Sequence, residues 1–418
     1  MKYGCIGKQL KHSFSKEIHE EFAPYSYDIC EIPPEELESF MKQGDFSAIN
    51  VTIPYKEAVI PYLFSISERA QKIGAVNTIV NRNGKLYGYN TDFFGMKSLI
   101  CKMGISLNNK KVAILGTGGT SKTAKAVAES MGASLILNVS RTEKEGAITY
   151  QELYKNYSDA EIIINTTPSG MFPNWNSVPV DIKKFNNLCG VVDVVYNPLN
   201  TLLVREAKSL GIKAESGLYM LVAQAVRASE IFLDTKYSED TIDKVYSKIR
   251  LPKRNIVLTG MPGSGKSTVG KIISEKLNMQ FYDSDEFIEK IFDKKISAIF
   301  SDEGEEFFRV NESEVICQLG SKNGIVLSTG GGAILRDINI DGMKQNGTVY
   351  FLDRPINELI PTDDRPLARS KEDIIKRYNE RYNTYVSTAD VIIPVDGTPE
   401  KIADKIIKDF LNYETLYN

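Results

Sequence analysis

The residues best suited to chemistry in this chain include a glycine-rich loop at residues 260–268, which contains Lys266 and Ser267. Its sequence, Gly-Met-Pro-Gly-Ser-Gly-Lys-Ser-Thr, fits the pattern G-x-x-x-x-G-K-[ST]. In that pattern, backbone N–H groups and a lysine hold phosphates, and a hydroxyl holds Mg²⁺. The alternative is a glycine-rich turn that fits the pattern by chance, so the flanking residues have to decide.

The flanks of the loop favour phosphate binding. Asn255–Thr259 is a short apolar run that predicts a buried strand, and apolar residues recur at helical spacing after the loop. A loop between a strand and a helix N-terminus offers several N–H groups and a positive dipole to an anion. The predicted nucleotide-binding residues are Gly263, Ser264, Gly265, Lys266, Ser267 and Thr268.

Lys56 and Asp92 suggest a second, acid–base chemistry. The chain has only two histidines, so most proton transfer has to rest on Lys, Asp, Glu and Arg. Polar residues cluster after predicted strands at 12–15, 50–56 and 88–92, with Asn77 and Thr78 between the last two. Ser, Asn, Thr and Asp also favour capped turns, and each cluster alone is more readily explained that way.

The totals set limits on the class of protein. A chain of 418 residues predicts two or three domains, and 42% hydrophobic residues is typical of a soluble globular protein. The net charge of −3 favours neither a nucleic-acid nor a membrane partner. Five scattered cysteines predict free thiols, and no apolar signal segment opens the chain. We expect a cytoplasmic protein.

Taken together, the three polar clusters resemble the substrate domain of shikimate dehydrogenase. The family patterns His-Ser-x-Ser, Asn-Val-Thr-x-Pro-x-Lys and Asn-Thr-Asp occur here in that order. The resemblance implies that Lys56 and Asp92 are catalytic. It also implies a substrate site formed by Ser13, Ser15, Thr52, Asn77 and Asp92.

A Lys/Asp pair suits ketone reduction. Hydride delivered to a carbonyl carbon leaves an alkoxide that needs a proton, which Lys56 can donate while Asp92 orients it. A nearby carboxylate favours the charged form of a lysine. The sequence leaves open whether Lys56 transfers the proton or mainly positions the substrate.

A dinucleotide loop follows the predicted strand Lys111–Leu115, and a predicted alanine-rich helix follows the loop. After the next predicted strand, at 134–139, Arg141 stands where an NAD site would carry an acidic residue, so we predict NADP. In the family a further basic residue follows; here Lys144 stands one place early. The expected cofactor-binding residues are Gly116, Thr117, Gly118, Gly119, Thr120, Ser140, Arg141, Thr142 and Gly217.

Three later blocks extend this resemblance to about residue 235. Residues 165–171 are similar to the family's loop beneath the nicotinamide, and residues 193–198 match a further block that contains Tyr196. Residues 217–226 resemble the helix that returns to the substrate domain. The resemblance implies that Tyr196 and Gln224 contact the substrate, although an apolar helix with one glutamine is usually core packing.

Residues 254–415 resemble shikimate kinase. Beyond the phosphate loop, the matching blocks contain Asp283, Asp285, Arg309, three glycines at 330–332, a polar segment at 364–368 and Arg381. A capping role for Asp285 at a helix start is the alternative for the paired carboxylates. The resemblance implies the following roles: Asp285 orients the attacking hydroxyl, Arg309, Arg381 and Gly331 hold the substrate carboxylate, Asp283 and Ser267 hold Mg²⁺, and Arg365 closes over the phosphates of ATP and is catalytic.

The fold expected from these patterns is α/β throughout. An α/β substrate domain (1–100, with 216–235 packing back) and a Rossmann-like NADP domain (101–215) precede a terminal helix and linker (236–253). A P-loop domain of the nucleoside-monophosphate-kinase-like, three-layer α/β/α type (254–418) follows. Patterns of this kind do not reveal the oligomeric state, and we expect a monomer or homodimer.

The expected function is two consecutive reactions: reduction of 3-dehydroshikimate with NADPH, then phosphorylation of shikimate from ATP. One alternative is a quinate/shikimate dehydrogenase fused to another small-molecule P-loop kinase. Another is a regulator that senses the metabolite without catalysis, and such a protein should have lost Lys56, Asp92, Lys266 or Asp285. All four are present.

Overall fold

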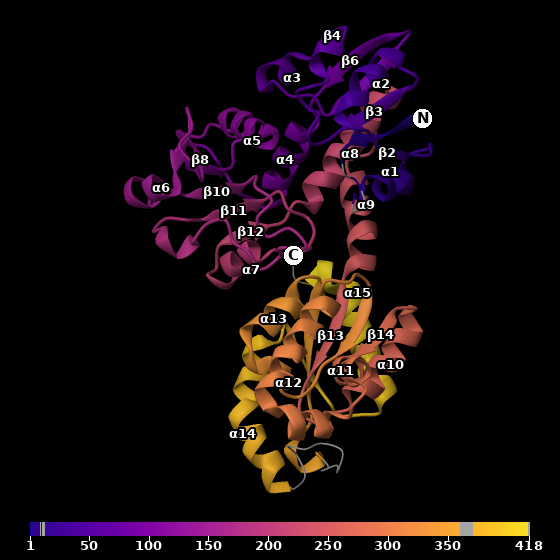
Figure 1. The fold of residues 1–418 in the computed structure, drawn as a ribbon, viewed down its shortest axis with the longest axis vertical. Helices are drawn as coiled ribbons and strands as arrows, with labels where there is room; N and C mark the ends of the chain where they lie inside the picture. The colour runs from indigo at the N-terminus through magenta and orange to yellow at the C-terminus, as the bar shows by residue number, and fades with distance from the viewer. Residues whose placement is uncertain (9, 11–12, 360–370, 417–418) are drawn as a thin grey trace. The chain divides into compact units, whose positions relative to one another are not determined.

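The computed structural model describes residues 1–8, 10, 13–359 and 371–416 (Figure 1). The chain forms two compact units, Met1–Ile249 and Arg250–Asn418. His12 and Arg365, which the sequence patterns single out, lie outside the described residues. Within the described part of the chain, no helix is long and apolar enough to cross a membrane.

The first unit begins with a mixed sheet of strand order β2-β1-β3-β5-β6-β4. Parallel pairs join β1 to β2 and β3, whereas β5 is antiparallel to both β3 and β6. The strands are β1 (Tyr3–Gly7), β2 (Asp28–Glu31), β3 (Ala48–Val51), β4 (Ser65–Ile66), β5 (Thr78–Arg82) and β6 (Lys85–Tyr89). The helices are α1 (Ser15–Phe22), α2 (Leu37–Gln43), α3 (Glu68–Ile73) and α4 (Asp92–Lys102).

A second sheet in this unit is parallel throughout, with the order β12-β11-β10-β7-β8-β9. The strand order changes direction at β7, because β8 lies on one side of it in the sheet and β10 lies on the other. Ligands of such sheets bind at this switch point, beyond the carboxyl ends of the strands. The strands are β7 (Lys111–Leu115), β8 (Leu135–Ser140), β9 (Ile148–Thr149), β10 (Ile162–Asn165), β11 (Gly190–Asp193) and β12 (Lys213–Glu215). The helices are α5 (Gly119–Ser130), α6 (Tyr150–Asn156), α7 (Leu202–Ser209), α8 (Leu218–Leu233) and α9 (Thr241–Arg250).

Helix α8 returns from the second sheet to the first, where it contacts α1, α4 and β5. Its approach to α4 is close, because a Cβ at Gly95 would lie 2.5 Å from the carbonyl oxygen of Met220. The chain then passes through α9 and a 3₁₀ turn at Leu251–Lys253 into the second unit. The segment expected to be a short linker is therefore regular in structure.

The second unit has a five-stranded parallel sheet of order β14-β15-β13-β16-β17. Its strands are β13 (Asn255–Thr259), β14 (Gln280–Asp283), β15 (Ile325–Ser328), β16 (Gly347–Asp353) and β17 (Val391–Pro394). Its helices are α10 (Lys266–Leu277), α11 (Ser284–Phe292), α12 (Ile296–Gly320), α13 (Asp337–Lys344), α14 (Lys371–Thr388) and α15 (Pro399–Leu416). Gly304 interrupts α12 with a φ of 86°, and the part of the helix that follows it carries Arg309.

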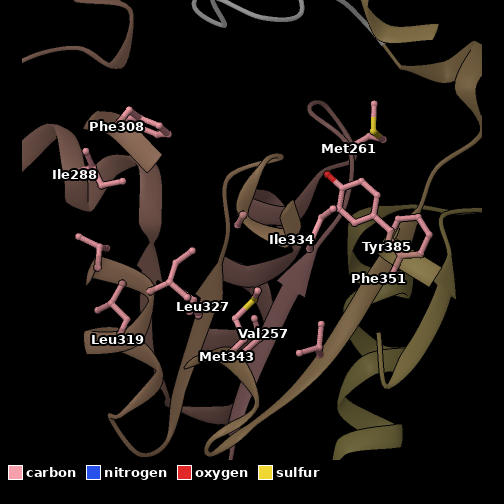
Figure 2. Close-up of a cluster of buried hydrophobic side chains, with 14 of the residues drawn as sticks. Val257, Met261, Ile288, Phe308, Leu319, Leu327, Ile334, Met343, Phe351 and Tyr385 are labelled. Atoms are coloured by element: carbon pink, nitrogen blue, oxygen red, sulfur yellow. The ribbon is translucent and has the colours of Figure 1, made fainter. Parts of the chain in front are cut away.

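Both faces of this sheet are buried, which gives the three layers expected from the sequence. Along β13, Val257 belongs to one apolar cluster, and Ile256 and Leu258 belong to the cluster on the other face. Figure 2 shows the first cluster, in which Tyr385 and Phe351 lie together below Met261 of the phosphate loop. Burial on both faces explains why the strands read as continuous apolar runs.

Candidate active sites

Lys56 and Asp92 form an ion pair in the first unit. Lys56 follows β3, and Asp92 is the first residue of α4. The Lys56 Nζ lies 2.6 Å from Asp92 Oδ2, and the two side chains are only 15% and 10% exposed. A charge-assisted hydrogen bond that is largely shielded from water is strong and well oriented. The pair therefore holds one ammonium group and one carboxylate at a fixed place.

Asn77 lies beside this pair with its amide orientation fixed. Asn77 Oδ1 accepts hydrogen bonds from the Thr91 N–H (2.7 Å) and the Thr78 hydroxyl (3.0 Å). The Thr91 hydroxyl lies 3.3 Å from Gln224 Oε1, to which it donates. Thr91, the residue before Asp92, thus links Asn77 to Gln224. Sequence patterns gave Thr91 and Thr78 no role of their own, because their contacts span separate elements.

The two serines expected to hold a carboxylate lie together. The Ser13 hydroxyl donates to the Ser15 hydroxyl at 3.1 Å, and Ser15 begins α1. The ring of Phe14, between them in sequence, lies 5.2 Å from the ring of Tyr196. Burial raises the pKa of Tyr196 to about 12, so its hydroxyl stays protonated. Thr52, half-buried after β3, donates its backbone N–H to Ile6 of β1.

The dinucleotide loop lies at the switch point of the parallel sheet. Gly116 has a φ of 110°, and a Cβ there would lie 2.8 Å from the Thr166 hydroxyl, so only glycine fits. The remaining loop residues, Thr117, Gly118, Gly119 and Thr120, lead into and begin α5. A Cβ at Gly119 would lie 4.0 Å from Lys56 Cδ. The structure therefore brings the loop next to the Lys56–Asp92 pair.

Two basic residues follow β8 near this loop. Arg141 is exposed beyond Ser140, whose hydroxyl accepts a hydrogen bond from the Thr142 N–H at 3.3 Å. Lys144 Nζ donates to the Thr117 hydroxyl at 3.1 Å, so it reaches the loop itself. A bridge between Lys144 and Ala147 reverses the chain here. That turn, which is invisible in residue spacing, brings Lys144 back to the loop although it stands one place early.

Gly217 and Asp193 fix the backbone that follows β11 and β12. A Cβ at Gly217 would lie 2.2 Å from the Val194 carbonyl oxygen, so the close approach requires glycine. Asp193 is fully buried, and its carboxylate accepts hydrogen bonds from Asn165 Nδ2 (2.9 Å), the Val195 N–H (3.0 Å) and the Thr201 hydroxyl (2.8 Å). These bonds connect the ends of β10 and β11 to the start of α7.

The stability of this unit should depend on the proton of Asp193. Burial raises the pKa of Asp193 from 3.8 to about 7, although its hydrogen bonds act in the opposite direction. The folded state thus binds the proton more tightly than the unfolded chain. The stabilisation is complete below a pH of about 4 and is lost as pH rises through about 7.

We therefore expect the free energy of unfolding of the wild-type chain, relative to Asp193→Asn, to fall by on the order of 4 kcal/mol between these limits. Urea unfolding followed by fluorescence of Trp175 measures it for the first unit alone, because Trp175 is the single tryptophan and is buried there. An identical pH dependence in both proteins would contradict the assignment.

The second unit contains a cavity of about 490 Å³ where the phosphate loop meets α11, α12 and α14. It gathers seven of the residues expected from the sequence: Lys266, Ser267, Asp283, Asp285, Arg309, Gly331 and Arg381. These residues are spread over 116 positions of the chain, and the parallel sheet brings them together at the carboxyl ends of its strands.

The phosphate loop has the backbone that an anion site needs. Gly263 and Gly265 have φ angles of 83° and 95°, which glycine adopts without strain. Lys266 Nζ donates to the carbonyl oxygens of Gly260 (2.8 Å) and Met261 (3.1 Å). Ser264 lies in the loop with a buried hydroxyl that has no partner among the described residues. Thr268 is exposed in the first turn of α10.

Asp283 and Asp285 have different roles. The alternative that Asp285 caps the start of a helix is wrong. Asp283, not Asp285, caps α11: its Oδ1 accepts from the Asp285 N–H at 3.0 Å. Its Oδ2 accepts from the Ser267 hydroxyl at 2.7 Å. Asp285 is the second residue of α11, and a Cβ at Gly330 would lie 2.5 Å from its Oδ1. The Asp285 carboxylate therefore lies against the glycine loop.

Arg309 and Arg381 lie in the same cavity with different partners. Arg309 Nη1 donates to Glu312 Oε2 at 2.7 Å, and Arg381 Nη1 donates to the Gly331 carbonyl oxygen at 3.0 Å. The Glu312 side chain is 1% exposed, and its Oε1 has no partner among the described residues. Burial raises the pKa of Glu312 against the opposing effect of Arg309. Sequence reasoning gave Glu312 no role, although its spacing of three from Arg309 on one helix was a signal.

Comparison with known proteins matches each unit to a family. The family model "Shikimate dehydrogenase substrate binding domain" matches residues 5–79, and "Shikimate kinase" matches residues 262–411. A Clostridium perfringens protein, "Shikimate dehydrogenase (NADP(+))", is 35% identical over 265 residues, which cover 59% of this chain and 98% of that protein.

Solved structures give the same result for the first unit. Shikimate dehydrogenase 1 from Peptoclostridium difficile is 37% identical with a TM-score of 0.55, covering 60% of this chain and 98% of that one. A Thermus thermophilus shikimate 5-dehydrogenase in complex with NADP(H) and shikimate is 27% identical with a TM-score of 0.54, covering 60% and 99%.

Proposed function

The chain belongs to the shikimate dehydrogenase family and carries a shikimate kinase domain after it, and we propose that it catalyses two consecutive reactions on one acid. The first unit reduces 3-dehydroshikimate to shikimate with NADPH. The second phosphorylates shikimate from ATP to shikimate 3-phosphate. The observation that carries the proposal is that one chain contains both matches, and the product of one family is the substrate of the other.

In the reduction, Lys56 binds the substrate carbonyl, either as its proton donor or as the cation that positions it, and Asp92 orients Lys56 and the substrate. The 2.6 Å contact with Asp92 holds the Lys56 ammonium beside the carbonyl oxygen on which negative charge develops. Asn77 Nδ2 donates one hydrogen to the Thr91 hydroxyl at 3.1 Å and offers its second hydrogen to a ring hydroxyl of the substrate. Ser13 and Ser15 hold the substrate carboxylate, and Thr52, Tyr196 and Gln224 complete the pocket. The glycine loop at 116–120 would hold NADP(H), which would supply the hydride when bound.

Cofactor preference provides a direct test of Arg141. Arg141→Asp should lower the ratio of kcat/KM for NADPH to that for NADH by about 10- to 100-fold, because a charge-assisted hydrogen bond to the 2′-phosphate is lost. Lys144→Ala should change the ratio in the same direction by less. Lys125→Asp, an equal charge change at an exposed position of α5, is the control and should leave the ratio unchanged. An Arg141→Asp chain with the wild-type ratio would refute the assignment.

In the phosphorylation, the cavity of the second unit positions both reactants. Asp285 orients the attacking hydroxyl, while Arg309, Arg381 and the Gly331 N–H hold the carboxylate of the acid. Lys266 and the loop N–H groups hold the phosphates. Arg365, which lies outside the described residues, is assigned to close over the phosphates only by the resemblance to shikimate kinase. Transfer needs position and positive charge more than covalent participation by the protein.

Mg²⁺ fits the oxygen groups of this site. Ser267 Oγ and Asp283 Oδ2 lie 2.7 Å apart at the end of the phosphate loop. Mg²⁺ prefers such hard oxygen ligands and takes its remaining ligands from phosphates and water. Ser267 and Asp283 would hold the ion there, and it would neutralise the charge of the phosphates during transfer.

The alternatives make different predictions. A quinate/shikimate dehydrogenase fused to another P-loop kinase would leave shikimate unphosphorylated, and a non-catalytic sensor would turn over neither substrate. The test supplies purified chain with 3-dehydroshikimate and NADPH, and separately with shikimate, ATP and Mg²⁺. Mass spectrometry should identify shikimate in the first reaction and shikimate 3-phosphate in the second. Absence of either product would contradict the proposal.

The cellular setting belongs to the same proposal. All five cysteines are free, which fits a reducing cytoplasm. Partners are small-molecule substrates, without nucleic acid or membrane, and the chain acts as a monomer or homodimer. Sedimentation of the purified chain measures the oligomeric state.

A further inference from the structure

Tyr385 lies beneath the kinase cavity, on α14 one turn after Arg381. Its side chain is fully buried, and its ring stacks on Phe351 of β16 with ring centres 5.0 Å apart and planes 7° from parallel. In Figure 2 its hydroxyl points from the apolar cluster toward the end of the sheet where Met261 lies. Stacking on Phe351 of β16 therefore fixes the ring and directs the hydroxyl toward the glycine loop and the phosphate loop.

The Tyr385 hydroxyl lies between two carbonyl oxygens that belong to different ligand loops. It is 2.5 Å from the oxygen of Gly331, in the glycine loop, and 3.1 Å from the oxygen of Gly260, in the phosphate loop. Both partners are acceptors, and a tyrosine hydroxyl carries one hydrogen. Burial raises the pKa of Tyr385, so this hydrogen is retained. The hydroxyl can therefore donate its hydrogen fully to only one of the two carbonyl oxygens at a time.

Each carbonyl also has a second donor, and each of these is a ligand-binding side chain. Lys266 Nζ donates to the Gly260 oxygen at 2.8 Å. Arg381 Nη1 donates to the Gly331 oxygen at 3.0 Å. Under the proposed function, Lys266 leaves Gly260 to reach the phosphates of the nucleotide, and Arg381 is held in place by the carboxylate of the acid.

We propose that Tyr385 is a positioning residue that couples nucleotide binding to acid binding by moving one hydrogen bond between Gly331 and Gly260. When Lys266 turns to the nucleotide, the hydroxyl replaces it as the donor to Gly260. Gly331 then depends on Arg381. When a bound acid holds Arg381 in place, Arg381 remains the donor to the Gly331 oxygen. The Tyr385 hydroxyl can then donate to the Gly260 oxygen instead. Each ligand therefore binds more tightly when the other is present.

The inference rests on the proposed function for the roles of Lys266 and Arg381, and it adds a thermodynamic consequence. Coupling between two sites is reciprocal, so the factor by which shikimate tightens the nucleotide must equal the factor by which the nucleotide tightens shikimate. Such factors commonly amount to about fivefold or more. A tyrosine that only filled space would not contribute to this factor.

The experiment uses Tyr385→Phe in the full chain, because phenylalanine keeps the stacked ring and removes only the hydroxyl. Isothermal titration measures the Kd of a non-hydrolysable ATP analogue with Mg²⁺, in the presence and absence of shikimate. Tyr350→Phe is the matched control: its hydroxyl donates to Asp409 at 2.8 Å, and it lies in the apolar cluster on the opposite face of the sheet. The 3-dehydroshikimate reductase rate of the first unit reports the active concentration of each preparation.

In the wild-type chain and in Tyr350→Phe, we expect shikimate to tighten the analogue by about fivefold or more. In Tyr385→Phe the factor should fall to about one, the analogue should bind more weakly, and kcat should fall. Wild-type coupling that survives in Tyr385→Phe, or a wild-type factor of one, overturns the role of Tyr385. A wild-type chain that does not phosphorylate shikimate at all contradicts the proposed function instead, so the two failures are distinguishable.

Discussion

Replacement of Lys56 by alanine should lower kcat/KM for 3-dehydroshikimate about 10²- to 10⁴-fold and leave shikimate phosphorylation within about twofold of wild type. The substitution removes the cation at the substrate carbonyl and leaves the 10%-exposed Asp92 carboxylate without the ammonium that lies 2.6 Å away. NADPH oxidation at 340 nm and a coupled ADP assay measure the two activities of the same preparation.

Lys122→Ala is the control for Lys56. Lys122 also pairs with a carboxylate of the first unit, at 2.8 Å from Glu57, but it is 43% exposed. An exposed pair of this kind contributes little, so both activities should be retained. Loss of both activities in Lys56→Ala would show that the two units do not work separately, and retention of both would remove Lys56 from the mechanism.

Lys56→Arg separates the two roles that sequence leaves open for Lys56. A guanidinium keeps the positive charge but is too weak an acid to donate a proton readily. If Lys56 only positions the substrate, Lys56→Arg should recover much of the activity lost in Lys56→Ala. If it transfers the proton, both variants should be similarly slow.

Replacement of Lys266 by alanine should have the opposite pattern, with kcat for phosphorylation lowered about 10²- to 10³-fold or more and reduction unchanged. Lys266 is the cation at the centre of the phosphate loop, is 8% exposed, and extends over the carbonyl oxygens of Gly260 and Met261. Without it, charge that develops on the transferred phosphate lacks its nearest compensation.

The matched control is Lys276→Ala on the same helix, α10. Lys276 is 43% exposed and pairs with Asp404 of α15 at 2.6 Å, away from the loop. Phosphorylation by Lys276→Ala should be within about twofold of wild type, because exposed ion pairs contribute little. If Lys266→Ala phosphorylated shikimate as well as this control did, the phosphate loop would not be the nucleotide site.

The parts of the fold that sequence predicts well are those set by local pattern. Asn255–Thr259 and Lys111–Leu115 are strands with the bounds that their apolar runs predict, since each run ends where glycine begins a loop. The short edge strands β4 and β9 have no such signal, because two residues at a sheet edge bury little. Their existence depends on the neighbouring strand.

The sequence predicts site residues that belong to short motifs. It does not predict contacts between residues that are far apart in the chain. The loop lysine and the Lys56/Asp92 pair come from compact motifs. The correction at Asp283 depends on which carboxylate faces the helix N–H groups, and that direction is set by β14. Tyr385 contacts Gly260 and Gly331 at separations of 125 and 54 residues, which spacing cannot encode. Arg365 lies outside the described residues and stays a prediction.

The most direct test of two consecutive reactions on one acid follows a hydrogen isotope through both. The full chain, as the only enzyme, receives 3-dehydroshikimate, NADPH deuterated at both C4 positions, ATP and Mg²⁺. The proposal predicts shikimate 3-phosphate with one deuterium on the carbon that bears the phosphate, because the hydroxyl made by reduction is the one phosphorylated. Deuterated shikimate that accumulates without phosphate, or a phosphate ester without deuterium, would contradict it.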